Sequence, residues 1–300
     1  MELKNYLSDI NGDDKLYLVV NKKLLDILNL SYSEIKSTIG SKKFLFDIGY
    51  SKSTFTQIMR GESFPSLKLI KLMEKFSNLE LLDSVYKCVD YMRGKTNSTT
   101  IKIPKSLSKE FVYLFGALRD GSLVHYSHVY EIEFAQKYRE WLDDSIVPRM
   151  RKIFDVEPNV KNRKNGTYII RKRSIVLFMI LNHFTNFFKE KYKHTPEVIL
   201  GLPFELQKFY IAGFYDAEGN KNPKDITFYQ QWWNKENCPP LADIQLMLRK
   251  VGIESYFRIK PQNDAFLFDL HVEGKSRKRF LEIIPIEHPV IHRCLVNSKL

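Results

Sequence analysis

Two apolar segments of the sequence end in an acidic residue followed by glycine, and these acids are the side chains most suited to chemistry. The earlier segment, Tyr113 to Gly121, carries Asp120, and the later one, Ile211 to Gly219, carries Glu218. A glycine that follows an apolar helix supplies the left-handed cap at which many helices end. Each acid is therefore expected at the end of a helix.

Small residues on the later segment predict that the two helices pack together. Gly213 and Ala217 are four residues apart, a spacing that lets a partner helix approach until the backbones nearly touch. Such packing would bring Asp120 and Glu218 together across an approximate twofold axis. Two close carboxylates repel each other and need a cation, and their hard oxygen ligands favour Mg²⁺, or Mn²⁺. Metals beside a phosphodiester can activate water and stabilise the leaving oxygen, which predicts metal-dependent hydrolysis.

The elements that must position the acids occur twice in the same order. In the earlier half we expect strands at 122–125 and 129–134, a helix over 138–154, a hairpin turning at Asn165-Gly166 with its return strand at 168–173, and a helix from 175. In the later half we expect a helix over 204–217, a strand at 226–229, a helix over 241–251, a hairpin of 255–260 with 265–272, and a helix over 275–284. The fold class is therefore α+β, with two pseudo-symmetric αββαββα units and curved antiparallel sheets.

Composition divides the chain into segments and restricts its class. We expect an N-terminal helical domain over 1–92, a polar linker over 93–108, and halves over 109–197 and 198–300. The net charge of +12 favours a polyanionic partner. The longest aliphatic run, Ile175 to Leu181, is far shorter than the ~18 residues that cross a bilayer. The three cysteines are widely spaced, which fits an intracellular compartment, cytoplasmic or organellar.

Residues 42–61 predict two short helices joined by a turn at Gly49, with Ser51 capping the second helix. The segment resembles the helix-turn-helix of phage repressors, in which an arginine-glycine pair and a Pro-Ser-Leu helix start recur. This resemblance implies an all-α domain whose second helix presents polar residues to DNA: Lys52, Ser53, Thr54, Gln57 and Arg60. Phe55 and Ile58 would pack inward. The alternative is a helical bundle used for protein contact.

The later acidic segment, Ile211 to Gly219, is similar to the nine-residue LAGLIDADG signature of homing endonucleases. The earlier segment stands at the equivalent place, but Gly116 falls one residue late and Arg119 replaces the usual alanine. The resemblance spans residues 109–300 and implies a monomeric enzyme with two motifs that cuts a specific site in double-stranded DNA. The departures predict a shifted or looser seam at the first motif, with Arg119 pointing away from the helix interface.

The same resemblance implies supporting residues near each acid. A glutamine at a strand end, here Gln136 or Gln230, would order water beside the scissile phosphate. A basic residue at the end of the return hairpin would polarise the phosphate, and Lys275 lies there in the later half. The earlier half has Ile175 at that place. The two sites are therefore expected to be unequal, with unequal strand cleavage or nicking.

Basic residues on the hairpins are the candidates for contacts with DNA. They are Lys161, Arg163, Lys164, Arg171, Arg173, Arg258 and Lys260. The concave sheet faces would lie in the major groove, where such side chains read base edges or contact phosphates. Two rival functions remain: a transcription regulator on a scaffold that has lost cleavage, and an intron maturase that binds RNA. Acids at both motif ends argue against the regulator.

Overall fold

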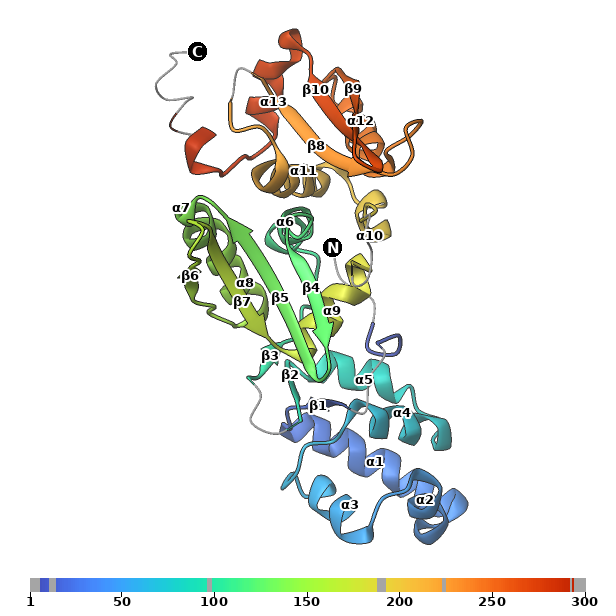
Figure 1. Cartoon of the computed structure of the whole chain (residues 1–300). Helices are drawn as coiled ribbons and strands as arrows, with labels where there is room; N and C mark the ends of the chain where they lie inside the picture. Colours follow the sequence, from blue (N-terminus) through green and yellow to red (C-terminus); the bar gives the residue numbers. More distant parts are fainter. Residues whose placement is uncertain are drawn as a thin grey trace. The chain divides into compact units, whose positions relative to one another are not determined.

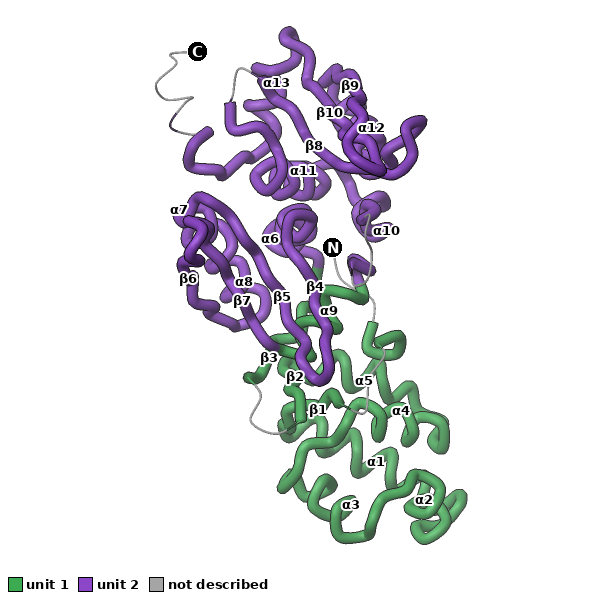
Figure 2. Tube along the Cα trace, in the orientation of Figure 1, with its two compact units in different colours: residues 1–106, 174–183 green, residues 107–173, 184–300 purple. Residues whose placement is uncertain are grey.

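The computed structural model describes residues 6–10, 15–95, 99–187, 193–222, 225–291 and 293. Figure 2 shows two compact units. One consists of residues 1–106 with 174–183, and the other of residues 107–173 with 184–300. Within the described ranges, no helix is both long and apolar enough to cross a membrane.

The N-terminal unit contains five consecutive helices and a small antiparallel sheet. The helices are α1 (Lys22–Ile39), α2 (Ser41–Ile48), α3 (Lys52–Met59), α4 (Leu67–Phe76) and α5 (Leu81–Cys88). The sheet, in the order β1-β2-β3, consists of β1 (Leu16–Leu18), β2 (Tyr91–Gly94) and β3 (Ile101–Lys102). This unit is therefore not all-α, and the expected linker over 93–108 contains part of the sheet. Strands of two to four residues are too short for sequence periodicity to reveal them.

Side-chain caps fix the helix starts in this unit. The Ser51 hydroxyl accepts from the amide of Thr54 at 3.1 Å, and α2 ends at Gly49 with a left-handed φ of 71°. On α3, Phe55 and Ile58 are buried, each with 2% of its surface exposed. The five polar residues expected to face DNA, Lys52, Ser53, Thr54, Gln57 and Arg60, are all exposed.

Helix α9 (Ile175–Thr185) belongs mainly to the N-terminal unit rather than to the first half, where the sequence placed it. It is apolar on almost every side, and a helix of this kind must be covered all round. Its residues Leu177 and Ile180 are fully buried, and within the same unit the His183 ring stacks on Tyr6 at 5.5 Å.

The first half of the larger unit has the predicted order of elements. They are α6 (Lys109–Ala117), β4 (Ser122–Tyr126), β5 (Val129–Gln136), α7 (Arg139–Trp141), the π turn η2 (Leu142–Ile146), α8 (Val147–Phe154), β6 (Val160–Asn162) and β7 (Tyr168–Arg173). The antiparallel sheet has the order β4-β5-β7-β6. Ile132 and Phe134 of β5 are buried in the core, so the alternate residues of this strand face away from it.

The second half repeats this plan with one strand fewer among its described residues. Its elements are α10 (Glu197–Leu200), α11 (Phe204–Glu218), β8 (Thr227–Trp232), α12 (Pro239–Arg249), β9 (Ser255–Gln262), β10 (Ala265–Val272), η3 (Gly274–Ser276) and α13 (Arg277–Ile283). The sheet order is β8-β10-β9. Where a first strand was expected, Gly219 forms only an isolated bridge to Phe228. The Asn220 side chain, next to this bridge, donates to Asp225 at 3.1 Å.

Candidate active site at the helix pair

The two motif helices, α6 and α11, lie side by side between the sheets of the larger unit (Figure 1). A Cβ atom added to Gly116 would lie 2.2 Å from the carbonyl oxygen of Tyr210. A Cβ atom added to Gly213 would lie 2.2 Å from the carbonyl oxygen of Tyr113. Only glycine permits these contacts, and they are equally close in both directions. The expectation of a looser seam at the first motif is therefore wrong.

The different glycine-to-acid spacing of the first motif is accommodated by an earlier end of its helix. Asp120 follows Gly116 by four residues, whereas Glu218 follows Gly213 by five. Helix α6 stops at Ala117 and Asp120 lies in the turn that follows, but α11 continues through Glu218. Both acids thus lie just beyond the glycine contact, as the sequence predicted.

The two acids influence each other electrostatically. Burial raises the pKa of Glu218 to about 7, and the negative charge of Asp120 contributes to this increase. Burial also raises the pKa of Asp120, although part of this side chain is exposed to solvent. Glu218 is half-buried, so solvent reaches both groups. Near neutral pH Glu218 is therefore partly protonated, and a cation that replaced this proton would relieve the repulsion between the two acids.

Two lysines that the sequence analysis missed lie beside the acids. The Lys193 ammonium donates to the carbonyl oxygens of Leu118 and Arg119 at 3.0 and 2.7 Å, at the end of α6. The Lys221 ammonium donates to the carbonyl oxygen of Asp216 at 2.7 Å, near the end of α11. Their charges lower the pKa of Asp120 and of Glu218, and burial lowers the pKa of Lys221 to about 8. Lys221 follows Glu218 by only three residues, a proximity that could have identified it.

Opposite charges occupy equivalent buried positions, each three residues after its seam glycine. Arg119, 5% exposed, donates to the Tyr210 hydroxyl at 3.3 Å and lies 4.7 Å from the centre of the Phe214 ring. Asp216, which has no exposed surface, accepts from the Tyr113 hydroxyl at 2.7 Å. Arg119 thus reaches across the interface, and the expectation that it points away is wrong. The Phe214 ring on α11 accommodates its guanidinium by cation–π contact.

The supporting residues predicted for the site have different surroundings. The Gln136 amide donates to the carbonyl oxygen of Ala217 at 3.4 Å, beside the second motif. The Gln230 side-chain oxygen accepts from Arg119 at 2.8 Å, beside the first motif. Each glutamine therefore reaches the motif of the other half. Lys275 is exposed and pairs with Glu273 at 3.1 Å, and among the described residues this is its ion-pair partner.

The comparisons with known proteins agree with this geometry. The homing endonuclease I-ApeI of Aeropyrum pernix is 33% identical over 185 residues, which cover 59% of this chain and 81% of that protein. The family model described as LAGLIDADG-like domain matches residues 205–285. The chain belongs to the LAGLIDADG homing endonuclease family.

Two further matches accompany this LAGLIDADG assignment. A crystal structure of I-DmoI in complex with DNA and Mn has 19% sequence identity and a TM-score of 0.48, covering 61% of this chain and 99% of that one. An A-type ATP synthase protein of Methanopyrus kandleri is 24% identical over 70% of this chain, but the match spans only 19% of that protein.

The basic residues predicted to contact DNA lie on the two sheets of the LAGLIDADG scaffold and, for Arg163 and Lys164, in the turn between β6 and β7. Arg163, Arg171 and Arg173 gather on the face of the first sheet opposite Ile132 and form ion pairs with glutamates there. Lys161 and Lys164 are exposed near the hairpin turn. On the second sheet, Lys260 pairs with Asp269 at 2.7 Å and Arg258 donates to the Tyr256 hydroxyl at 3.1 Å.

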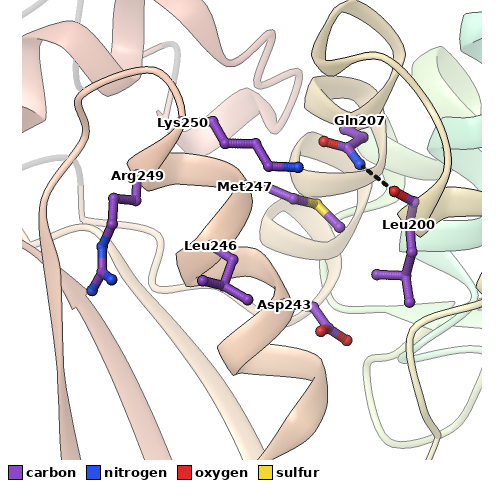
Figure 3. A pocket seen from close by; sticks show the side chains of 7 residues that line it. All are labelled: Leu200, Gln207, Asp243, Leu246, Met247, Arg249 and Lys250. Atoms are coloured by element: carbon purple, nitrogen blue, oxygen red, sulfur yellow. Dashed lines mark hydrogen bonds between the residues drawn. The ribbon is translucent and has the colours of Figure 1, made fainter.

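A cavity of about 340 Å³ in this LAGLIDADG unit has neither acid in its lining (Figure 3). Its lining residues are Leu200, Gln207, Asp243, Leu246, Met247, Arg249 and Lys250. The Gln207 amide donates to the carbonyl oxygen of Leu200 at 3.2 Å, and burial raises the pKa of Asp243. In the ranges that the structure describes, no three His, Cys, Asp or Glu residues group to hold a metal.

Proposed function

We propose that this chain cuts both strands of a specific DNA duplex by Mg²⁺-dependent hydrolysis, using Asp120 and Glu218 at two pseudo-symmetric sites. The observation that carries the proposal is the meeting of these acids at the ends of two helices in backbone contact. Their mutual repulsion makes a cation favourable, and the +12 charge of the chain favours a polyanionic substrate.

The residues present fit a magnesium or manganese ion. Mg²⁺ in phosphoryl-transfer sites is held by one or two carboxylates together with substrate phosphates and water, rather than by a complete cage of protein ligands. Asp120 and Glu218 would provide those carboxylates. A bound ion supplies an acidified water and charge for the leaving oxygen.

Side chains around the acids would assist the same reaction. The ammonium groups of Lys193 and Lys221 lie close enough to lower the pKa of both acids, so they would also offset charge on a phosphate held there. The amides of Gln136 and Gln230, one beside each motif, can hydrogen-bond water. Lys275 would act on DNA from the surface rather than at the acids.

Residues away from the acid pair are proposed to bind the DNA duplex. The basic residues of the two sheets would contact bases and phosphates, and the exposed face of α3 would give a second DNA contact as a helix-turn-helix. One chain supplies both motifs, so a monomer suffices. A DNA substrate implies action inside the cell, in the cytoplasm or an organelle.

A plasmid library with randomised inserts tests the proposal without a known target. Wild-type protein should linearise a subset of plasmids with Mg²⁺ and none with EDTA. Asp120→Asn and Glu218→Gln should each slow linearisation at least about a hundredfold, as expected when a metal ligand is lost. Glu157→Gln, which removes an exposed carboxylate from the same unit, is the matched control.

The outcomes separate the rival functions. Cleavage that persists in both acid variants would contradict the proposed mechanism. Selective retention of duplexes without cleavage would indicate a regulator. Binding of RNA but not of duplex DNA would indicate a maturase.

A further inference from the structure

The open face of the first-half sheet has an unexpected charge pattern for a surface that binds DNA. Glu131 of β5 pairs in register with Arg173 of β7, and Glu133 pairs with Arg171. Because Ile132 between them is buried in the core, these four side chains share the opposite face. Carboxylates on this face would repel phosphate, so they weaken electrostatic attraction to DNA.

The two glutamates lie beneath the arginines. Glu131 and Glu133 expose only 4% and 17% of their side chains, whereas Arg171 and Arg173 expose 47% and 66%. Glu131 accepts from Nε of Arg173 at 3.1 Å and pairs with Nε of Arg171 at 2.9 Å. Glu133 accepts from Nη2 of Arg171 at 2.7 Å and of Arg163 at 2.6 Å. The guanidinium groups are thus anchored at their inner edges and open to solvent at their outer edges.

An anchored guanidinium suits base recognition better than phosphate binding. A guanidinium has five N–H donors, and Glu131 takes the Nε donor of Arg173. The remaining donors have the fork geometry that matches O6 and N7 of guanine in the major groove. Fixing the side chain beforehand also reduces the conformational entropy lost on binding. For phosphate, where direction matters less, the same ion pairs would only reduce the attraction.

We propose that Glu131 and Glu133 are specificity-determining residues that orient Arg171 and Arg173 to read guanine bases. The inference rests on the proposed function, because it requires duplex DNA on this face. It is limited to the first sheet. On the second sheet the buried Asp269 holds Lys260, whose ammonium is a point charge without a fork.

The proposal predicts that loss of either glutamate raises the affinity for DNA of mixed sequence but lowers the preference for guanine. Both are measured in EDTA so that cleavage does not interfere. The probes are a mixed-sequence duplex and a randomised duplex library from which bound sequences are selected. Glu131→Gln and Glu133→Gln should bind the mixed-sequence duplex several-fold more tightly, because a negative charge is lost. In the selected pool they should show about tenfold weaker preference for guanine at the positions where the wild type enriches it.

Two further variants complete the test. Glu157→Gln removes an exposed carboxylate that pairs with Arg151, away from the anchored arginines, and should leave the guanine preference unchanged. Arg173→Lys keeps the charge but lacks the fork, so it should lose guanine preference without gaining affinity for mixed sequence. Unchanged guanine preference in Glu131→Gln, Glu133→Gln and Arg173→Lys would overturn the inference while leaving cleavage at the acid pair intact. Failure of the proposed function would instead appear as no selective duplex binding by the wild type.

Discussion

The two halves of the larger unit agree in their backbones and differ in their polar side chains. At the seam, Gly116 and Gly213 make the same contact in opposite directions. Three residues later the halves carry opposite charges, Arg119 and Asp216, each bound to a tyrosine of the other helix. The two halves therefore share the contact that sets helix separation and differ in the polar groups beyond it.

The difference gives each side of the seam its own network. Around Asp216, the Tyr113 hydroxyl also accepts from the Trp141 indole at 2.9 Å, and the amide of Glu287 donates to the carboxylate at 2.9 Å. Burial nevertheless raises the pKa of Asp216 to about 6. Around Arg119, the acceptors are the Tyr210 hydroxyl, the Gln230 side-chain oxygen and the carbonyl oxygens of Lys193 and His194. The buried cation thus lies in one network and the buried carboxylate in the other, and the charge of Arg119 acts across the seam on Glu218.

The largest predicted effect tests the symmetric part of this comparison. Gly116→Ala and Gly213→Ala should each reduce the free energy of unfolding by about 3 kcal/mol or more, because the added Cβ meets backbone that cannot move alone. Urea denaturation of the full chain measures both losses. Gly201→Ala, where a Cβ meets no atom within 4 Å, is the control. A loss for one seam glycine only would show that the helix contact is not reciprocal.

A smaller effect is expected from the asymmetric part. Arg119→Met should destabilise the fold by about 2–3 kcal/mol, since buried acceptors lose their donor. Asp216→Asn should cost about 1–2 kcal/mol, since one acceptor oxygen is retained. Arg119→Met should also raise the pKa of Glu218 further, because the arginine charge lowers it. Thermal denaturation measures these losses, with Arg151→Met at an exposed position as the control. An Arg119→Met variant as stable as the wild type would contradict the comparison.

The raised pKa of Glu218 predicts two pH effects. Below pH 7 a proton competes with the cation, so cleavage at limiting Mg²⁺ should fall about tenfold per pH unit.

An acid whose pKa is raised by folding makes the fold less stable as pH rises from the unfolded value of 4.5 to about 7. At pH 8, Glu218→Gln should therefore stabilise the fold, on the order of 1 kcal/mol after solvent screening. A flat pH profile, or destabilisation by this variant at pH 8, would contradict the electrostatics.

The smallest effects concern the two DNA strands. Because Arg119 and Asp216 give the acids different surroundings, the two strands of a selected target should be cut at rates that differ about three- to tenfold, or by ~1 kcal/mol. Lys275→Met should change either rate by about twofold at most, since its ammonium pairs with Glu273 at the surface. Time courses on a duplex labelled on both strands measure the rates. Equal rates would remove the link between asymmetric side chains and asymmetric cleavage.

Local patterns in the sequence predicted most of the fold because they have local causes. The return strand Tyr168–Arg173 follows a two-residue turn signal. Ser51 caps α3 by accepting a hydrogen bond from the amide of Thr54, three residues later. The αββαββα pattern also implied a strand before β8, and among the described residues only an isolated bridge from Gly219 to Phe228 lies there.

The acid pair was also predictable, because motif spacing fixes helix ends. The supporting residues were less so. Lys193 lies 72 residues or more from the carbonyl groups it binds, and no sequence pattern reports such a contact. Arg119 was expected to avoid the interface because a charge rarely enters a helix seam. Tertiary partners make that burial favourable: Tyr210 and Phe214 on α11, the Gln230 side chain, and the carbonyl oxygens of Lys193 and His194.

The most direct test of the acid pair is the titration of Glu218, which needs neither metal nor target DNA. Carboxyl ¹³C NMR of protein labelled at glutamate, assigned with Glu218→Gln, gives this pKa. We predict a titration near 7 in the wild type that moves down in Asp120→Asn, because the neighbouring charge is lost. A value near 4.5 that is unaffected by Asp120→Asn would contradict the claim that the two helix ends bring these carboxylates together.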